Sequence, residues 1–233
     1  MSTTGVLPSS LRKPSILGDA AATRSPRKGG RRIRLGNPGR CPKTPTLTMF
    51  ICDDSGSLYG PAGSDPLSNR YGEVHRALEA VARHCFCGKC QAAIIHFDTP
   101  TTGCVDPTPL TRTGMRRLAN GLTVPHDATG ASLLEGSLTQ AEALAAHYPD
   151  HPLALCILTD WELFDDNASD LFSRLASYPG KVYAVGLRNP PPLDLLGPAT
   201  QTVTVTRDSP QGSLACAMFD SLTIHRSGRA LAA

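Results

Sequence analysis

Residues 50–60, FICDDSGSLYG, carry three oxygen-bearing side chains at every second position after an apolar run. They are Asp53, Ser55 and Ser57, and in an extended loop this spacing points all three the same way. Gly56 lets the backbone turn tightly between the serines. A carboxylate with two hydroxyls, lacking Cys and His, suits Mg²⁺ or Mn²⁺ better than zinc. The stretch is therefore either part of a metal site or a polar turn that ends a strand.

The elements that must position these side chains begin at Thr46, where apolar runs of strand length alternate with helical patterns. The runs predicted as buried strands are TLTMFIC, QAAIIHFDT, LALCILTD and KVYAVGLRN, with TTGCVDPTPL and QTVTVT as edge strands. Helices are predicted over 69–85, 111–122, 131–147, 167–178 and 209–224. Near-continuous apolar runs are typical of parallel strands buried on both faces. The pattern predicts a doubly wound α/β fold, with a mainly parallel central sheet flanked by helices on both faces.

In such sheets, ligands gather beyond the carboxyl ends of the strands. Asp160 ends the run LALCILTD, which places it at the same sheet edge as Asp53. Thr129 and Ser132 flank the start of the helix predicted over 131–147, where a hydroxyl can complete an oxygen cage. Three loops then supply oxygens at one edge. The predicted metal ligands are Asp53, Ser55, Ser57, Ser132 and Asp160, with Thr129 as the alternative to Ser132.

Over residues 46–225 the chain resembles the von Willebrand factor A (vWA) domain family, also called the integrin I-like fold. The resemblance rests on three motifs in the family's order, FICDDSGS, TGASLLEGSLTQA and LCILTDWE, and on two further strands, AAIIHFDT and KVYAVGL. It implies a Rossmann-like vWA fold with a metal-ion-dependent adhesion site (MIDAS). Ser55 and Ser57 would bind Mg²⁺ directly, and Asp53 and Asp160 would act directly or through water. An acidic side chain of a protein partner usually fills the remaining position, so the resemblance implies a binding module and no enzyme.

Two positions depart from the family's pattern. Ser132 stands where the family commonly has Thr, and Trp161 stands where it has Gly. A bulky residue does not easily adopt a positive φ, so we expect the loop after Asp160 to have a different conformation. The tryptophan either lies on the rim of the site as a contact anchor or packs inward on the sheet.

The stretch HCFCGKC, residues 84–90, offers a different metal chemistry. Cys85, Cys87 and Cys90, joined by His84 or Cys104, could hold a structural zinc ion. A second C-x-x-C pair at regular spacing is missing, so we favour reduced thiols without a metal over zinc or a redox pair.

Charge divides the chain into unequal parts. Residues 1–43 contain ten Lys and Arg and one Asp, a net charge of +9, whereas the remainder carries thirteen basic and nineteen acidic residues, a net charge of −6. We predict a disordered basic arm over 1–43, a vWA-like domain over 44–226 and a flexible tail over 227–233. The arm either binds nucleic acid or only solubilises the protein. The sequence shows no export signal and no membrane-spanning stretch, so we expect a cytoplasmic protein.

The function that we expect is metal-dependent binding of a protein partner through an acidic residue. Bacterial members of the family often work beside an ATPase, which makes an ATPase one candidate partner. The alternatives are a metal-dependent hydrolase or a zinc-stabilised regulatory protein. A G-x-S-x-G elbow is absent, and His96 is more typical of a satisfied core residue than of a base. We expect Asp54 to point away from the metal ligands into solvent.

Overall fold

The computed structural model describes residues 33–59, 65–67 and 69–232. Its centre is a six-stranded sheet in the order β4-β3-β2-β5-β6-β7. The strands are β2 (Thr46–Cys52), β3 (Cys90–His96), β4 (Val105–Pro109), β5 (Leu153–Thr159), β6 (Lys181–Leu187) and β7 (Gln201–Val205). Only β4 pairs antiparallel, and it lies at an edge of the sheet, as does the alternating strand β7. The predicted doubly wound, mainly parallel α/β fold is confirmed.

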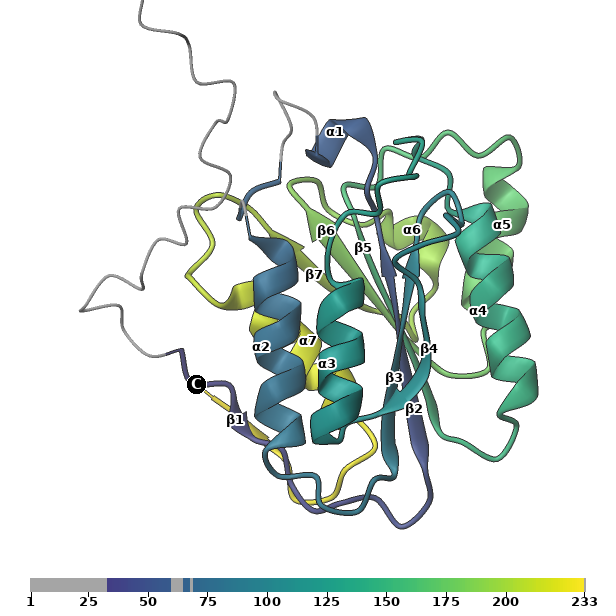
Figure 1. Ribbon diagram of the computed structural model, residues 1–233. Helices are drawn as coiled ribbons and strands as arrows, with labels where there is room; N and C mark the ends of the chain where they lie inside the picture. Colours follow the sequence, from purple (N-terminus) through teal and green to yellow (C-terminus); the bar gives the residue numbers. More distant parts are fainter. Residues whose placement is uncertain (1–32, 60–64, 68, 233) are drawn as a thin grey trace, which may run out of the picture. The chain divides into compact units, whose positions relative to one another are not determined.

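Helices cover both faces of this sheet (Figure 1). One layer holds α2 (Arg70–Ala82), α3 (Arg112–Gly121) and α7 (Ser213–Thr223), and the other holds α4 (Glu135–His147), α5 (Ala168–Ala176) and α6 (Leu193–Leu196). Alternate residues of β2 face the two layers, so Phe50 and Cys52 join one core cluster while Met49 and Ile51 join the other. This period of two across a sheet buried on both faces explains the continuous apolar runs.

Helix α4 begins at Glu135, four residues later than predicted. The backbone N–H groups of Leu134 and Glu135 donate to the two carboxylate oxygens of Asp165, at 3.0 and 2.8 Å. This side chain satisfies donors that the first turn of a helix leaves unpaired. Residues 131–134 therefore stay outside the helix, where Ser132 belongs to a loop.

The folded unit extends beyond the predicted range 44–226 at both ends. Strand β1 (Gly36–Asn37) pairs antiparallel with β8 (Ala230–Leu231), and Leu35 is buried against the core. The apolar side chain of Leu35 explains why this part of the basic segment folds onto the domain. Residues 1–32 lie outside the described residues, so disorder of the remaining arm stays a prediction. Within the described part of the chain, no helix combines the length and apolar character needed to cross a membrane.

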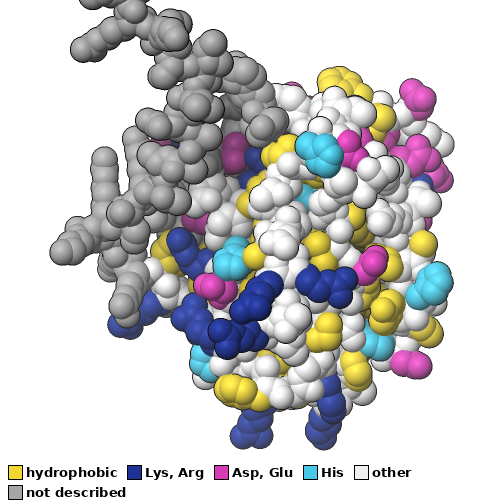
Figure 2. Space-filling view, in the orientation of Figure 1, with side chains coloured by type: hydrophobic (Ala, Val, Ile, Leu, Met, Phe, Trp, Pro, Cys, Tyr) yellow, Lys and Arg dark blue, Asp and Glu magenta, His cyan; other side chains and the backbone are white. Residues whose placement is uncertain are grey.

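Positive charge gathers on one layer of the domain. Figure 2 shows Lys and Arg side chains clustered over α2 and α3. The exposed members there include Arg83, Arg112, Arg116 and Arg117. The described domain thus carries a basic face of its own, in addition to the basic residues of the arm.

Candidate metal centre

The ends of β2 and β5 bring Asp53 and Asp160 to the same edge of the sheet. The two strands pair in parallel up to Cys52 and Leu158, and the Asp53 N–H donates to the Leu158 carbonyl at 3.0 Å. Asp53 lies directly beyond β2, and Asp160 lies directly beyond β5. Both side chains are fully buried. The structure therefore places the two predicted acidic ligands together, as the parallel-strand rule requires.

The carboxylate of Asp53 is held on both oxygens. Oδ1 accepts from the Ser55 N–H at 2.7 Å, and Oδ2 accepts from the Thr159 hydroxyl at 2.6 Å. Burial raises the pKa of Asp53 to about 6, although these hydrogen bonds lower it, and the nearby charge of Asp160 adds to the rise. Burial disfavours the ionised form of this carboxyl group, and a nearby cation would favour that form again.

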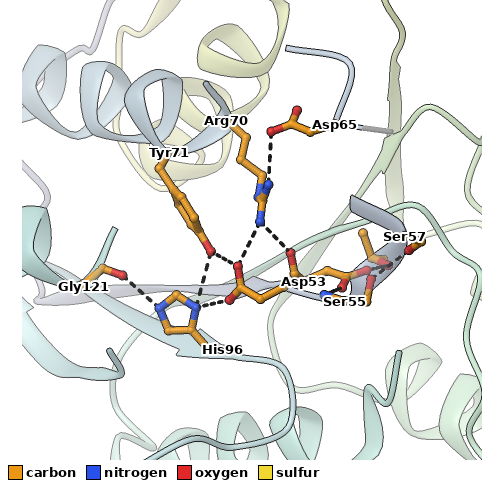
Figure 3. Close-up of polar contacts among 10 residues, drawn as sticks. Asp53, Ser55, Ser57, Asp65, Arg70, Tyr71, His96 and Gly121 are labelled. Carbon is orange, nitrogen blue, oxygen red and sulfur yellow. Dashed lines mark hydrogen bonds and ion pairs between the residues drawn. The ribbon is translucent and has the colours of Figure 1, made fainter. Parts of the chain in front are cut away.

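The two serines after β2 form the next part of the site. Their hydroxyl oxygens, Ser55 Oγ and Ser57 Oγ, lie 2.9 Å apart, and Figure 3 shows both beside Asp53. The short helix α1 (Gly56–Tyr59) begins between them. The Gly56 N–H donates to the Gly130 carbonyl at 2.9 Å, which fastens this loop to the loop that carries Ser132.

Ser132 and Thr129 have different surroundings. Ser132 is buried, and its carbonyl accepts from the Phe164 N–H at 2.9 Å, which joins its loop to the loop after β5. Thr129 is exposed, and its hydroxyl donates to Asp98 Oδ2 at 2.6 Å. The side chain of Asp98 also accepts from the Ala131 N–H at 2.9 Å, so it holds this loop in place. These contacts favour Ser132 over Thr129 as the predicted fifth ligand.

Asp160 carries the feature that points most directly to a cation. Its Oδ1 accepts from the Glu162 N–H at 3.1 Å, but its buried Oδ2 has no hydrogen-bond partner among the described residues. Within the same residues, neither Asp160 nor Asp53 forms an ion pair. Buried carboxylates without a compensating charge are costly. Hard oxygen donors of this kind fit Mg²⁺ or Mn²⁺.

The expectation that Asp54 is solvated is wrong. Asp54 is buried, and its Oδ1 lies 2.9 Å from Arg70 and accepts from the Tyr71 hydroxyl. Its Oδ2 lies 2.5 Å from His96 Nδ1, and Figure 3 draws these contacts around Arg70, Tyr71 and His96. Successive side chains alternate across a strand end, so Asp54 faces the layer of α2 instead of water. His96 Nε2 donates to the Gly121 carbonyl at 2.9 Å, which confirms His96 as a satisfied core residue.

The conformational expectation for Trp161 is also wrong, because its φ is +60°. The Trp161 N–H donates to Thr159 Oγ1 at 3.1 Å, which helps to hold this left-handed conformation. The half-buried side chain packs against the core cluster beneath α4 and α5. The exposed aromatic on the loop after β5 is instead Phe164, at 74%, whose N–H donates to the Ser132 carbonyl, and Leu133 next to Ser132 is 41% exposed.

Sequence reasoning missed Thr159, Asp98 and Asp165, which position the loops without being predicted ligands. Thr159 was visible only as the last residue of a strand. Asp165 caps a helix that begins 30 residues earlier in the chain, and no local sequence signal announces such a contact. Each of the three residues forms hydrogen bonds to a different loop, so its role becomes visible only when the loops are placed together in the structure.

No protein-family model matches this sequence, and no curated protein matches it. Solved structures do resemble it in fold. The pilus adhesin SpaC of Lactobacillus rhamnosus GG is similar with a TM-score of 0.61 and 12% identity over 80% of this chain and 31% of the adhesin chain.

A von Willebrand factor type A protein of Catenulispora acidiphila is similar with a TM-score of 0.51 and 14% identity, over 82% of this chain and 48% of that chain. This chain thus spans less than half the length of either structure. Together with the parallel sheet and its two helical layers, these similarities show that the chain has a vWA-like fold.

Proposed function

We propose that this chain is a protein-binding module that holds Mg²⁺, or Mn²⁺ in its place, at the edge of the sheet. The observation that carries the proposal is the buried, unpaired Oδ2 of Asp160 beside the buried carboxylate of Asp53. A divalent cation there would compensate both charges, whereas the described residues supply no cationic side chain for them.

Five side chains would hold the ion. Ser55 and Ser57 would contribute hydroxyl oxygens, Asp53 and Asp160 would contribute negative charge, and Ser132 would close the set from the third loop. The bound ion would supply positive charge to a carboxylate of a protein partner. The chain's own residues orient the oxygens and keep them from water, and no catalytic step is assigned to them.

The surface beside the site adds a preference for the partner's chemistry. Phe164 and Leu133 are exposed, and the Phe164 N–H is bonded to the Ser132 carbonyl. Exposed aromatic and aliphatic side chains are frequent anchors of protein interfaces. We therefore propose a partner that presents an acidic residue flanked by apolar side chains, and an ATPase is one class to test.

Calorimetric Mg²⁺ titration tests the metal. Wild type should bind one ion per chain, and Asp160→Ala should abolish the heat of binding. Asp208→Ala is the matched control, because Asp208 is an exposed acid that follows β7 and should leave binding unchanged. Equal Mg²⁺ binding by wild type and Asp160→Ala would overturn the proposal.

Affinity capture of partners tests the binding function. Capture should fall when the metal is chelated, and Phe164→Ser should weaken it while leaving the Mg²⁺ titration unchanged. A partner captured equally well with and without chelator would contradict a metal-bridged contact.

The proposed compartment is the cytoplasm. None of the eight cysteines forms a disulfide, and Cys52 and Cys156 are buried on neighbouring strands β2 and β5. Cysteines without disulfides suit a reducing compartment.

A further inference from the structure

A second cluster of metal-binding side chains lies at the other end of the central strands, where β2 and β3 begin. It consists of Cys41, which follows β1, Cys85 and Cys87, which follow α2, and Cys90, which opens β3. Cys90 pairs with Thr46 at the start of β2, whereas Asp53 follows the end of that strand. A seven-residue strand is about 20 Å long, which separates the two ends of β2 by that distance. The cysteine cluster is therefore separate from the candidate Mg²⁺ centre.

The sulfur positions fit a tetrahedral zinc site. The Sγ atoms of Cys41, Cys85 and Cys87 all lie within 4.8 Å of one another, and Cys85 Sγ is 3.8 Å from Cys87 Sγ. Zinc–sulfur bonds of about 2.3 Å in a tetrahedron require sulfur–sulfur distances of about 3.8 Å. Cys85 and Cys90 are close enough that each shifts the pKa of the other, which is raised for Cys85 and lowered for Cys90. Three sulfurs are thus grouped around one point, and Cys90 is the neighbour of Cys85 that can complete the set.

Neighbouring donors are arranged to stabilise thiolates. The Lys89 N–H donates to Cys87 Sγ at 3.4 Å, across a turn in which Gly88 has a φ of +65°. The buried Arg226 donates through Nη1 to Cys90 Sγ at 3.4 Å. Four thiolates around Zn²⁺ carry a net charge of −2, so a buried guanidinium and a backbone N–H compensate it. Such hydrogen bonds to metal-bound sulfur orient ligands and strengthen metal binding.

The other ligands considered from the sequence are not part of this group. The ring Nδ1 of His84 bonds to the Ala80 carbonyl at 3.1 Å, and only the backbone carbonyl of His84 contacts Cys41 Sγ. Cys104 lies near His96 and Asp106, in a different part of the domain. The missing ligand is Cys41, which stands 44 residues before Cys85 in the segment that the sequence assigned to a disordered arm.

We propose that Cys41, Cys85, Cys87 and Cys90 bind one structural Zn²⁺ ion. The ion would tie the segment around Cys41 to the turn between α2 and β3. It would add to the contact that Arg226 Nη2 already makes with the Gly39 carbonyl at 3.0 Å. A zinc ion whose ligands come from two distant segments stabilises the folded state, because the unfolded chain does not hold the four sulfurs together.

The test is the zinc content of the full chain, purified under reducing conditions without chelator and measured by mass spectrometry of the metal. Wild type should retain one zinc ion per chain. Cys41→Ala and Cys87→Ser should each lose most of it. Cys216→Ser is the matched control, because Cys216 is a half-buried thiol of α7 outside the cluster. Asp160→Ala should also retain the zinc, which keeps this result independent of the Mg²⁺ proposal.

A second measurement covers variants that fail to fold. Stepwise modification of wild-type thiols should release zinc in parallel with the reaction of the clustered cysteines, and Co²⁺ exchanged into the site should show thiolate-to-metal absorption. A folded, reduced wild type without zinc would overturn the proposal, as would full zinc retention in both Cys41→Ala and Cys87→Ser. A disulfide within the cluster in that reduced protein would overturn it as well.

Discussion

The hydroxyl of Thr159 donates a 2.6 Å hydrogen bond to Asp53 Oδ2, so the end of β5 orients the acid at the end of β2. Thr159 Oγ1 also accepts from the Trp161 N–H at 3.1 Å. Thr159 thereby links the two acidic loops while lying outside the predicted ligand set. It is a positioning residue, and its effect on the metal should pass through Asp53.

Thr159→Val should weaken Mg²⁺ binding. The substitution keeps the shape of the side chain but removes the hydroxyl, which leaves Asp53 less well oriented and the Trp161 N–H without its acceptor. Loss of such outer contacts typically costs about 10-fold to 100-fold in metal affinity. Calorimetric Mg²⁺ titration at pH 7 measures the change. Thr159→Ser retains the hydroxyl and should bind nearly as wild type; equal affinities for Thr159→Val and wild type would contradict the role assigned to this contact.

Mg²⁺ affinity should fall as the pH decreases from 7 to 5. Burial raises the pKa of Asp53 to about 6, so the group is mostly ionised at pH 7 and mostly protonated at pH 5. A proton on the ligand competes with the metal, and this pKa gives a decrease in apparent affinity of about tenfold across that range. Titrations at half-unit intervals, with circular dichroism confirming that the fold persists, provide the check. An affinity independent of pH would exclude Asp53 as a ligand that must lose a proton.

Asp53→Asn should stabilise the metal-free protein at pH 7. Because the pKa of Asp53 is about 6 in the folded state against an ordinary value of 3.8, the folded state binds the proton more tightly. Protonation of Asp53 therefore stabilises the folded wild type below pH 3.8, and this contribution is lost as the pH rises through 6. By pH 7 the wild type has lost about 3 kcal/mol of unfolding free energy in this way, a loss that the asparagine variant avoids.

Urea denaturation in the presence of a chelator measures this effect. The difference in unfolding free energy between Asp53→Asn and wild type should grow in favour of the variant between pH 4 and pH 7. With Mg²⁺ present the order should reverse, because only wild type gains stability from the ion. A difference that does not change with pH would show that Asp53 is not the group that titrates.

The sheet edge was predictable because continuous apolar runs indicate buried strands, and their alternation with helices indicates parallel pairing. TLTMFIC and LALCILTD place Asp53 and Asp160 at the same edge of the sheet, and the structure shows that β2 and β5 are parallel neighbours. Because each acid directly follows its strand, the pairing of β2 with β5 determines the position of both acids, independently of the loop conformations. The sequence therefore predicts the placement of the two acids better than any loop conformation.

Loop conformations depended on contacts from distant residues. The Asp165 carboxylate ends the loop of Ser132 at Glu135, 30 residues earlier in the chain. Asp54 is buried because Arg70, the first residue of α2 and 16 residues away in the chain, reaches its carboxylate. Propensity rules treat each residue with its neighbours in sequence, and none of these contacts is between such neighbours.

Trp161→Gly should be more stable than Trp161→Ala. Both substitutions remove the same packing of the indole against the core, so their difference isolates the backbone. At a φ of +60° alanine is strained and glycine is not, which favours the glycine variant by about 1 kcal/mol. Thermal or urea unfolding of the two variants gives the comparison. An alanine variant as stable as the glycine variant would mean that the loop has relaxed to a negative φ.

Glu73→Gln should destabilise the fold through helix α7. The buried Glu73 on α2 accepts from the Gly212 N–H at 3.0 Å and from the Ala215 N–H at 3.1 Å. A carboxylate at a helix N-terminus satisfies unpaired donors and interacts favourably with the helix dipole. Glutamine supplies one acceptor oxygen and no charge, so one buried N–H loses its partner at a cost of about 1–3 kcal/mol.

Glu79→Gln is the matched control for this cap, because Glu79 lies on the same helix. Its side chain is half exposed and pairs with Arg83 at 3.9 Å, a contact worth less than about 1 kcal/mol. Urea denaturation should therefore separate the two variants clearly. Equal unfolding free energies for Glu73→Gln and Glu79→Gln would show that α7 finds other acceptors for its first turn, and that the buried carboxylate contributes no more than an exposed one.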